Sequence, residues 1–448
     1  MKNRGPTSKL RHFRKADEGQ ALVLTALALV VIMLMAGLGV DVGYLRYQKQ
    51  QMQKAADAGA LAAASALVYR SPKWKVAAVA DVAANGFTAT PSNGITIGAY
   101  NPPIDPPFNT APDNLNYVEV VVSQPQPTFF MRVIGGFTTV PVTARSIASA
   151  AGSASGCIYV LDPSHFGSYT ISGGARLTSA CGLFIDSHNP NALVESGSGT
   201  CTKATYIGIV GSDEGSEGAC FPGAQPVSDI APFGDPLAGL QPPAVPTCPL
   251  LGPPASSPPG SCSYHRDSGF HCTQSADLHH GTYCGGITAS GSNVTLTFGP
   301  GTYVLEGGGM NITGGANANG TEVTFYNTVN AADTPAYGAI SITGASNTSL
   351  SAPTSGPLEG ILFFQDRNLP PRYVHTVNDT ISGDRNTNFV GALYFPLTNQ
   401  LNYTGGSLAT AYTVIVAYDL TITANSMVND DYSTIGGISP IHSAVLVQ

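Results

Sequence analysis

The sequence predicts an α+β region followed by a longer all-β region, in a chain of 448 residues. Residues 19–70 contain no proline and are rich in helix-forming side chains. After residue 150 the chain breaks into short β-branched and aromatic runs separated by Gly, Ser and Asn, which is typical of strands and turns. The high counts of glycine (51) and proline (33) also favour turn-rich β structure over helix bundles.

The first element is an uncharged stretch from Gly19 to Val40. As a helix it would be about 33 Å long, enough to cross the hydrocarbon core of a bilayer. A secretory signal has a shorter apolar region, and here the helical pattern continues beyond the stretch. Six basic residues precede it, so the positive-inside rule places residues 1–18 in the cytoplasm and the chain after about Asp41 on the other side. We predict a single transmembrane helix at residues 19–40.

Residues 41–150 are predicted to form a small α+β module. Ser71-Pro72 should end the long helix, and "WKVAAVADVAANGF" should form a second one that Asn85-Gly86 closes. The segments "ITIGAY", "NYVEVVVSQ" and "FTTVPVTARSIASA" are expected as strands, and "PTFFMRVIGG" as a helical turn. A helix that leaves the membrane and is followed by a small antiparallel sheet is a pilin-like arrangement.

Two features of the long helix allow more than one interpretation. Gly39 and Gly43 are four residues apart, as are Ala55 and Gly59, so small residues share a face and permit close helix approach. Small residues are also common in such helices without that role. Asp41 is expected at the outer membrane boundary with a hydrated carboxylate, and a functional acid inside the membrane is the alternative.

Several spaced pieces of the N-terminal region resemble TadE/TadG-like proteins of tight-adherence (Flp) pilus assembly. They are the basic tail, "DEGQALVL", the apolar span, "DVG" from Asp41, and "KAADA" from Lys54 with its alanine run, together about residues 11–67. The resemblance implies a bacterial inner-membrane protein of the pilus-assembly apparatus. Processed pilin-like relatives are cut after a glycine and carry glutamate five residues later. Gly19 has Leu24 at that distance, so we predict an uncut anchor.

Charge and cysteine content differ between the two regions. Residues 1–150 hold 14 Lys/Arg and 8 Asp/Glu, whereas the rest holds 6 and 20. The C-terminal region therefore offers no basic patch for nucleic acid, and its acidity suits solubility and weak cation binding. All eight cysteines lie after residue 150, which indicates disulfides in an oxidising compartment. Their pairing stays open.

The β-rich region, residues 151–448, repeats a short phrase. "TIS" or a close variant, followed by small turn residues, begins near residues 170, 286, 311, 341, 380 and 421, and Gly-Thr-Tyr occurs at 281 and 301. Such spacing favours stacked coils that cannot bury their apolar faces alone. We predict a parallel β-helix, with a β-sandwich as the alternative. The proline-rich residues 221–263 should form an extended excursion within this domain, tied to the coils by Cys248 and Cys262.

No catalytic, cofactor-binding or metal site is predicted. The segment from Cys262 to Cys284 gathers three cysteines and four histidines, but it lacks the close pairs of zinc sites, so disulfides are favoured. Asp162 and Ser164 match the start of a metal-dependent adhesion motif. Phe166 stands where the second serine belongs, so a turn capped by Asp162 is expected.

Two further acidic candidates have a simple structural interpretation. Asp366 and Arg367 follow an apolar strand and should form a local salt bridge. Asp430 and Asp431 are adjacent, so on a strand they would point to opposite faces. Nucleophile elbows, phosphate-binding loops and dinucleotide fingerprints are absent from the sequence.

We therefore predict a non-catalytic single-pass membrane protein of a Tad/Flp-type pilus assembly or a related surface or secretion apparatus. Its extracytoplasmic β-domain would act as a scaffold or adhesin. The expected partners are the membrane and other pilus-assembly or envelope proteins, with glycan as an open option and nucleic acid excluded. The competing interpretation is a membrane-anchored polysaccharide-active lyase or hydrolase, or a glycan-binding β-helix protein.

Overall fold

The computed structural model divides the chain into two compact units. Met1–Gly152 and Ser443–Gln448 form the first, and Ser153–His442 forms the second. In sequence, the second unit is therefore inserted before the last strand of the first. This differs from the predicted domain end at residue 448, because the last strand joins the sheet of the first unit. The structure describes residues 17–68, 72–104, 106–110, 114–153, 156–214, 220–230, 232–245, 248, 262–265, 268–329, 336–345, 347–383, 387–404, 413–428 and 442–447.

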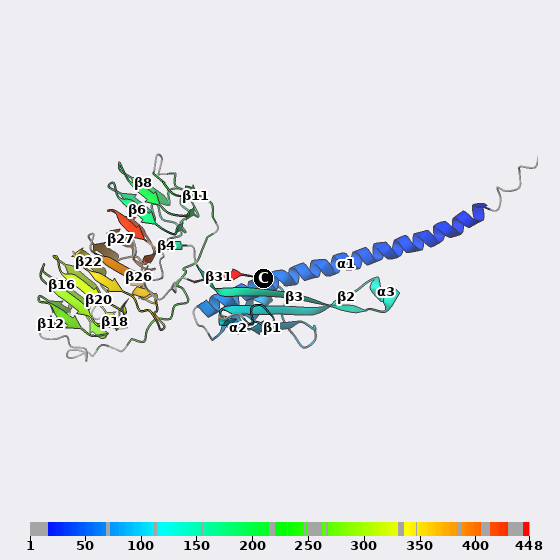
Figure 1. Ribbon diagram of the computed structural model, residues 1–448, viewed down its shortest axis with the longest axis horizontal. Coiled ribbons are helices and arrows are strands. Elements are labelled where there is room, and N and C mark those ends of the chain that lie inside the picture. Colours follow the sequence, from blue (N-terminus) through cyan, green and yellow to red (C-terminus); the bar gives the residue numbers. More distant parts are fainter. Residues whose placement is uncertain are drawn as a thin grey trace, which may run out of the picture. The chain divides into compact units, whose positions relative to one another are not determined.

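In the first unit, a long helix lies along a four-stranded sheet in the order β1-β2-β3-β31 (Figure 1). The β1–β2 and β2–β3 pairs are antiparallel, as the sequence predicted. The elements are α1 (Asp17–Val68), α2 (Trp74–Ala84), β1 (Thr96–Tyr100), η1 (Asn114–Asn116), β2 (Tyr117–Pro127), α3 (Met131–Gly135), β3 (Thr139–Ser153) and β31 (His442–Leu446).

Small side chains dominate the core of this unit. α1 buries Met52 and five alanines against α2 and the sheet, where Val118, Val120 and Val122 of β2 are also buried. At Gly59 a Cβ would lie 2.6 Å from Cγ2 of Val82 and 3.0 Å from a backbone oxygen of α2, so only glycine allows this approach of α1 to α2. A Cβ at Gly39 or Gly43 would meet nothing within 4 Å. One of the two predicted small-residue pairs therefore serves packing within the chain.

The second unit is wound from stacked coils (Figure 1). Among the described strands of this unit the pairs are parallel except for β12–β13, and one isolated antiparallel bridge joins Asn191 and Asp213. One ten-stranded sheet runs in the order β12 (Cys262–His265), β13 (Gly269–Cys272), β16 (Ile287–Ser290), β19 (Met310–Thr313), β22 (Ile340–Ala345), β25 (Asn378–Gly383), β27 (Gln400–Thr404), β29 (Leu420–Ile422), β5 (Tyr169–Ser172), β8 (Leu193–Ser196). This stacking confirms a β-helix-like architecture over the sandwich, whose sheets are antiparallel.

A second, fourteen-stranded sheet branches at β26. Its main line is β11 (Pro226–Val227), β10 (Ile207–Ile209), β7 (Gly182–Ile185), β4 (Gly156–Val160), β28 (Thr413–Ala417), β26 (Asn388–Phe395), β23 (Ser349–Ser351), β20 (Asn317–Gly320), β17 (Thr295–Phe298), β14 (Ala276–Leu278). Its branch is β24 (Ile361–Gln365), β21 (Val323–Thr328), β18 (Gly301–Glu306), β15 (Gly281–Cys284). The remaining elements are the three-stranded sheet β30 (Ser426–Val428), β6 (Arg176–Ser179), β9 (Cys201–Lys203), and η2 (Pro371–Tyr373).

The repeated phrase of the sequence corresponds to one sheet. All six copies lie in the ten-stranded sheet, in β5, β16, β19, β22, β25 and β29. One apolar residue of each copy stacks in register from coil to coil: Ala289, Ile312, Ile342, Ile381, Ile422 and Ile171. Tyr403 of β27 lies between Ile381 and Ile422 in this row, and all seven residues are at most 1% exposed. Each copy therefore supplies one rung of a buried ladder.

A second ladder consists of aromatic rings inside the coils. Tyr283, Tyr303, Phe325, Phe363 and Phe395 follow one another with centroid distances of 5.8, 5.3, 5.3 and 6.1 Å. All five rings are buried. Offset ring contacts at these distances add to the stabilisation from burial, so the ladder strengthens the stacking of neighbouring coils.

The chain enters this stack in the middle rather than at an end. After entering, the chain forms the coils β4–β6 and β7–β9 and then β10 and β11, which lie toward one end of the stack. The next strand, β12, lies at the opposite end. The later coils then wind back until β28, β29 and β30 pair with β4, β5 and β6. We call this junction the seam. The first and last coils of the unit are neighbours there.

The proline-rich excursion is fastened to coils at several points between the two ends. The Phe233 N–H donates to Asp186 Oδ1 at 3.0 Å, and Cys248 is bonded to Cys284. Arg367 donates to the backbone oxygen of Leu237 at 2.7 Å and also to that of Leu240. The predicted excursion is thus held along the stack.

The predicted salt bridge between Asp366 and Arg367 is wrong. The guanidinium of Arg367 is used by the carbonyl groups of the excursion. Asp366 instead accepts from the Thr328 hydroxyl at 2.6 Å and from the Asn368 N–H at 2.8 Å. Asp366 closes the turn that follows β24 by accepting the Asn368 N–H, and this turn leaves the Arg367 side chain to bind the excursion.

Candidate functional site

The N-terminal part of α1 presents apolar side chains with no protein around them. Within Leu22–Leu67, one stretch has a mean hydropathy of 2.7 and is 6% buried. Among the described residues this is the one helix with the length and composition to cross a membrane. Leu22, Ile32 and Met35 are 71%, 65% and 69% exposed. Such a surface suits lipid, so α1 is a candidate membrane anchor.

Asp41 lies where the uncharged stretch ends, and it is 1% exposed. Its carboxylate accepts backbone N–H groups from Phe129, Phe130 and Met131 at 2.9, 2.8 and 2.6 Å. These groups begin α3, whose own N-terminal residue provides no side-chain cap. The expectation of a hydrated carboxylate is therefore wrong, because the amides of another segment replace water. Asp41 fastens α3 to α1.

A second polar contact ties α1 to the sheet. Glu119 of β2 is 1% exposed, pairs with Nε of Arg145 on β3, and accepts the Ile104 N–H at 2.7 Å. The amide of Gln53 on α1 donates to the backbone oxygen of Arg145 and to Asp57, each at 2.8 Å. The helix that carries the apolar stretch is thereby fixed to the antiparallel sheet.

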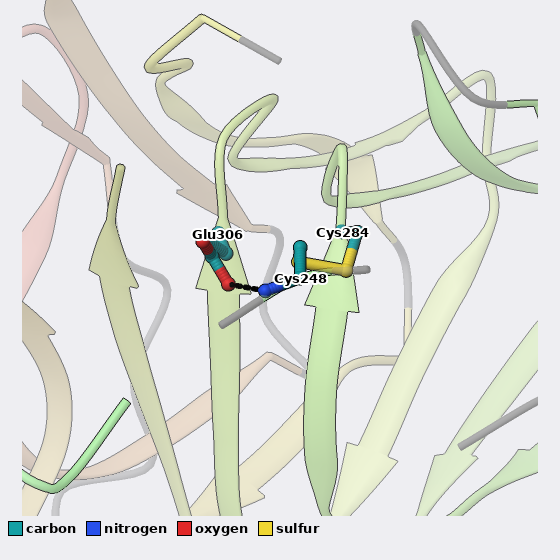
Figure 2. Close-up of side chains that lie close together, drawn as sticks. All are labelled: Cys248, Cys284 and Glu306. Atoms are coloured by element: carbon teal, nitrogen blue, oxygen red, sulfur yellow. Dashed lines mark hydrogen bonds between the residues drawn. A yellow bond between two sulfur atoms is a disulfide. The ribbon is translucent and has the colours of Figure 1, made fainter. Parts of the chain in front are cut away.

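In the second unit, the eight cysteines form four disulfides, as the sequence predicted without assigning pairs. The bonds join Cys157 to Cys181, Cys201 to Cys220, Cys248 to Cys284 and Cys262 to Cys272. Figure 2 shows Cys248 bonded to Cys284, with the Cys248 N–H donating to Glu306 at 3.0 Å. Because both sulfurs are in the disulfide, neither is a thiolate ligand for a metal.

Among the described residues, the histidines near these cysteines form no metal-ligating group, although the rings of His265 and His271 pack edge-on with a centroid distance of 5.4 Å. The His271 ring contacts Ser268 at 3.0 Å, and that of His280 contacts the Pro300 carbonyl at 3.1 Å. His265 contacts Ser263 at 3.2 Å. These three imidazoles bind neighbouring hydroxyl or carbonyl groups, so the arrangement matches the disulfide interpretation.

A different cluster lies at the seam. Asp162 follows β4, and its Oδ1 accepts the backbone N–H groups of Ser164 at 2.7 Å and His165 at 2.9 Å, which is the predicted capped turn. His165 Nδ1 lies 2.8 Å from Oδ2 of Asp419, which follows β28. Donor atoms of Asp162, His165 and Asp419 lie within 4.8 Å of one another, so these three residues could hold a metal ion.

The electrostatics of this cluster depend on burial. The pKa of Asp419 is raised to about 7, chiefly because the carboxyl group is buried; His165 opposes this shift and the nearby Asp162 contributes to it. Asp419 is 6% exposed, and its Oδ1 has no hydrogen-bond partner. A proton on Asp419 near neutral pH would relieve the repulsion between the two carboxylates.

The other acids of the second unit are dispersed. A groove of about 580 Å³ lies between the excursion and the coils, and five of its lining residues are prolines. Glu322 is the one carboxylate among the lining residues, and it accepts from Thr354 at 2.7 Å. Asp379 is buried beneath β22, where its Oδ1 accepts the Ile340 N–H at 2.7 Å. Asp430 and Asp431 lie outside the described residues.

These features define an apolar helix fastened to a small antiparallel sheet, together with a disulfide-bonded β-helix-like unit. The Flp pilus-assembly TadE/G-like family model matches residues 19–66, and the Tad-like Flp pilus-assembly model matches residues 53–148. The resemblance seen in the N-terminal sequence is thus confirmed. No curated protein matches the chain, and no solved structure does.

The sequence did not indicate what Asp41 and Arg367 bind. Asp41 reaches backbone groups 88 to 90 residues away, and Arg367 reaches carbonyl groups 127 and 130 residues away. Both side chains bind main-chain atoms. Because every residue has such atoms, the sequence does not indicate which of them a given side chain will bind. The sequence therefore carried no signal for either contact.

Proposed function

We propose that this chain is a non-catalytic, membrane-anchored component of a Tad/Flp-type pilus assembly or a related surface apparatus. Residues 19–40 would span the bacterial inner membrane, with residues 1–18 in the cytoplasm. The pilin-like module, residues 41–150 with the last strand, would stand beyond the membrane. The β-helix-like unit would act there as a scaffold or adhesin toward other envelope proteins.

The main support is the coincidence of the family matches with the structural elements. The first match covers the exposed apolar part of α1, and the second covers its packed part together with α2 and the β1–β3 sheet. Four disulfides support an oxidising compartment for the second unit. Membership of a pilus-assembly apparatus suggests a non-enzymatic role.

Photocrosslinking in intact cells tests the assembly role. A benzoylphenylalanine placed at Gly39 or Gly43 would project from α1 where the chain offers no contact. We expect a covalent product with a pilin or with a membrane protein of the pilus platform. The control is the same residue at Phe87, which is aromatic and 8% exposed and should react only within the chain. Capture of proteins unrelated to any pilus at both glycines would contradict the proposal.

Topology needs a separate test. After mild reduction, a membrane-impermeant maleimide should label Cys220 and Cys262, the two partly exposed cysteines, in cells whose outer membrane has been opened. Labelling only after the inner membrane is dissolved would place the second unit in the cytoplasm and overturn the topology.

The groove beside the excursion motivates the test of a second candidate, a polysaccharide-active or glycan-binding protein. Prolines and a single carboxylate line it, whereas hydrolysis by paired carboxylates needs two acids about 5–10 Å apart. Incubation of the purified full chain with neutral and uronate polysaccharides, with calcium, would decide. Reproducible chain cleavage would replace the non-catalytic proposal.

A further inference from the structure

One short segment of the first unit exposes aromatic rings. The α3 loop, residues 128–137, joins β2 to β3 and contains α3. Phe129, Phe130 and Phe137 are 51%, 43% and 59% exposed, and Val133 is 77% exposed. Elsewhere in the first unit, the inward-facing apolar side chains of the sheet form a core with α1, and exposed apolar residues outside α1, such as Ile104 and Leu115, are separate positions in the sequence. A contiguous exposed apolar segment of this kind marks a contact surface.

The α3 loop is held against the part of α1 where the uncharged stretch ends. The ring of Phe130 lies so close to Gly37 that a Cβ there would meet it at 2.6 Å. Phe129 packs edge-on against Tyr44 with a centroid distance of 5.4 Å. Between these contacts, the carboxylate of Asp41 accepts three backbone N–H groups of the loop. Three different interactions therefore fix the level of the loop along α1.

We propose that the α3 loop inserts its apolar side chains into the outer interfacial layer of the bilayer that α1 spans. This inference rests on the proposed membrane anchor. Phe130 contacts α1 at Gly37, which is three residues inside the predicted span. At about 1.5 Å per residue its ring lies a few ångströms below the membrane boundary. The bilayer is therefore the apolar medium that already surrounds α1 at this level.

The charges of the segment fit lipid. Arg132 is exposed beside the aromatic rings, where its guanidinium can reach a lipid phosphate. The loop contains no acidic residue, and the carboxylate of Asp41 is already bound by amides. Aromatic and basic residues at this depth are the anchors that set the tilt and rotation of a transmembrane helix. The loop would thus hold the sheet in one orientation on the membrane.

Fluorescence quenching by brominated lipid tests this inference in the full chain reconstituted into phosphatidylcholine–phosphatidylglycerol vesicles. Trp74 is the sole tryptophan, so a Trp74→Phe background allows a single reporter to be placed. Phe137→Trp reports on the loop and Val31→Trp on the span. Tyr100→Trp is the matched water-exposed control, because Tyr100 pairs with Glu119, eight residues and roughly 26 Å from the loop end of β2.

We expect lipid brominated near the headgroup to quench the loop reporter about threefold more than the Tyr100→Trp reporter. A loop reporter as weakly quenched as that control, with the Val31→Trp reporter strongly quenched, would overturn the insertion and leave the anchor intact. Blue-shifted emission that bromolipid does not quench would place the loop against protein and also overturn it. Failure of the Val31→Trp reporter to be quenched would instead refute the anchor itself.

Discussion

The two units bury very different side chains. The first packs α1 against its sheet through alanines and Gly59, whereas the second fills each coil with isoleucine, tyrosine and phenylalanine. A helix that lies close to another backbone has room only for small residues. A coil closes around an interior that large residues must fill. The stability of the first unit therefore depends on small side chains that allow close backbone contact. The stability of the second unit depends on large side chains that fill the coils.

This contrast predicts opposite sensitivities to substitution, which the single tryptophan makes measurable. Trp74 lies on α2 and reports the first unit, while the buried tyrosines of the second unit report through near-ultraviolet circular dichroism. Both signals can be followed in one urea titration in detergent micelles.

The largest effect should come from removing a ring of the aromatic ladder. Phe363 is fully buried between Phe325 and Phe395. Phe363→Ala should lower the free energy of unfolding of the second unit by about 3–5 kcal/mol, through lost burial and a cavity. The tyrosine transition should shift while the Trp74 transition stays. Phe363→Leu is the control, with a smaller loss, and equal losses would contradict the ladder's role.

The next effect concerns the disulfide that links the first two coils. Cys157 and Cys181 are 24 residues apart. Replacing both by serine should cost the second unit about 3 kcal/mol, because the unfolded chain regains its loop entropy. The midpoint of the tyrosine transition measures this loss. A matching shift in the Trp74 signal would mean that the two units do not unfold separately.

In the first unit, adding side-chain volume between α1 and α2 should lower the free energy of unfolding. Gly59→Val places side-chain atoms against Val82 and the backbone of α2, and should cost about 1–3 kcal/mol. The Trp74 transition should shift while the tyrosine transition stays. Gly43→Val is the matched control, because nothing lies within 4 Å of a Cβ there. An equal response of the two variants would refute the close approach of α1 to α2.

A gradual, pH-dependent effect should appear in the second unit as the pH rises from about 4 to about 7. Burial raises the pKa of Asp379 from 3.8 to about 7. The folded protein therefore holds a proton that the unfolded chain releases. Asp379 contributes stability that is full below pH 4 and is lost as pH rises to about 7, by roughly 1 kcal/mol per pH unit.

Denaturation at several pH values measures this slope. Asp379→Asn keeps the acceptor for Ile340 and should flatten the slope, although Asp419, whose pKa is also raised to about 7, retains part of it. Asp277→Asn, at an exposed position, should leave the slope unchanged. An unaltered slope in Asp379→Asn would show that Asp379 does not carry the effect.

Local pattern made part of this structure predictable. The transmembrane stretch, the β2 strand and the strands of the repeated phrase could be predicted because each signal lies within one short segment. These signals are the uncharged run, the alternating valines and the repeated phrase itself. Long-range partners did not follow from such patterns. The phrases at 170 and 421 suggested nothing about adjacency, yet Ile171 stacks on Ile422. Only the complete fold brings together the backbone groups that pair at the seam. The same is true of the backbone groups that bind the carboxylate of Asp41 and the guanidinium of Arg367.

The position of the seam has a consequence for how such chains can diversify. Since the first and last coils are neighbours, the outer coils at either end can be multiplied or removed while the junction with the rest of the chain stays the same. Each added coil lengthens the stack by about 4.8 Å, which one or two extra excursion residues can span. The length of the β-helix-like unit could therefore change by duplication of coils, with no compensating substitution in the membrane-anchored first unit.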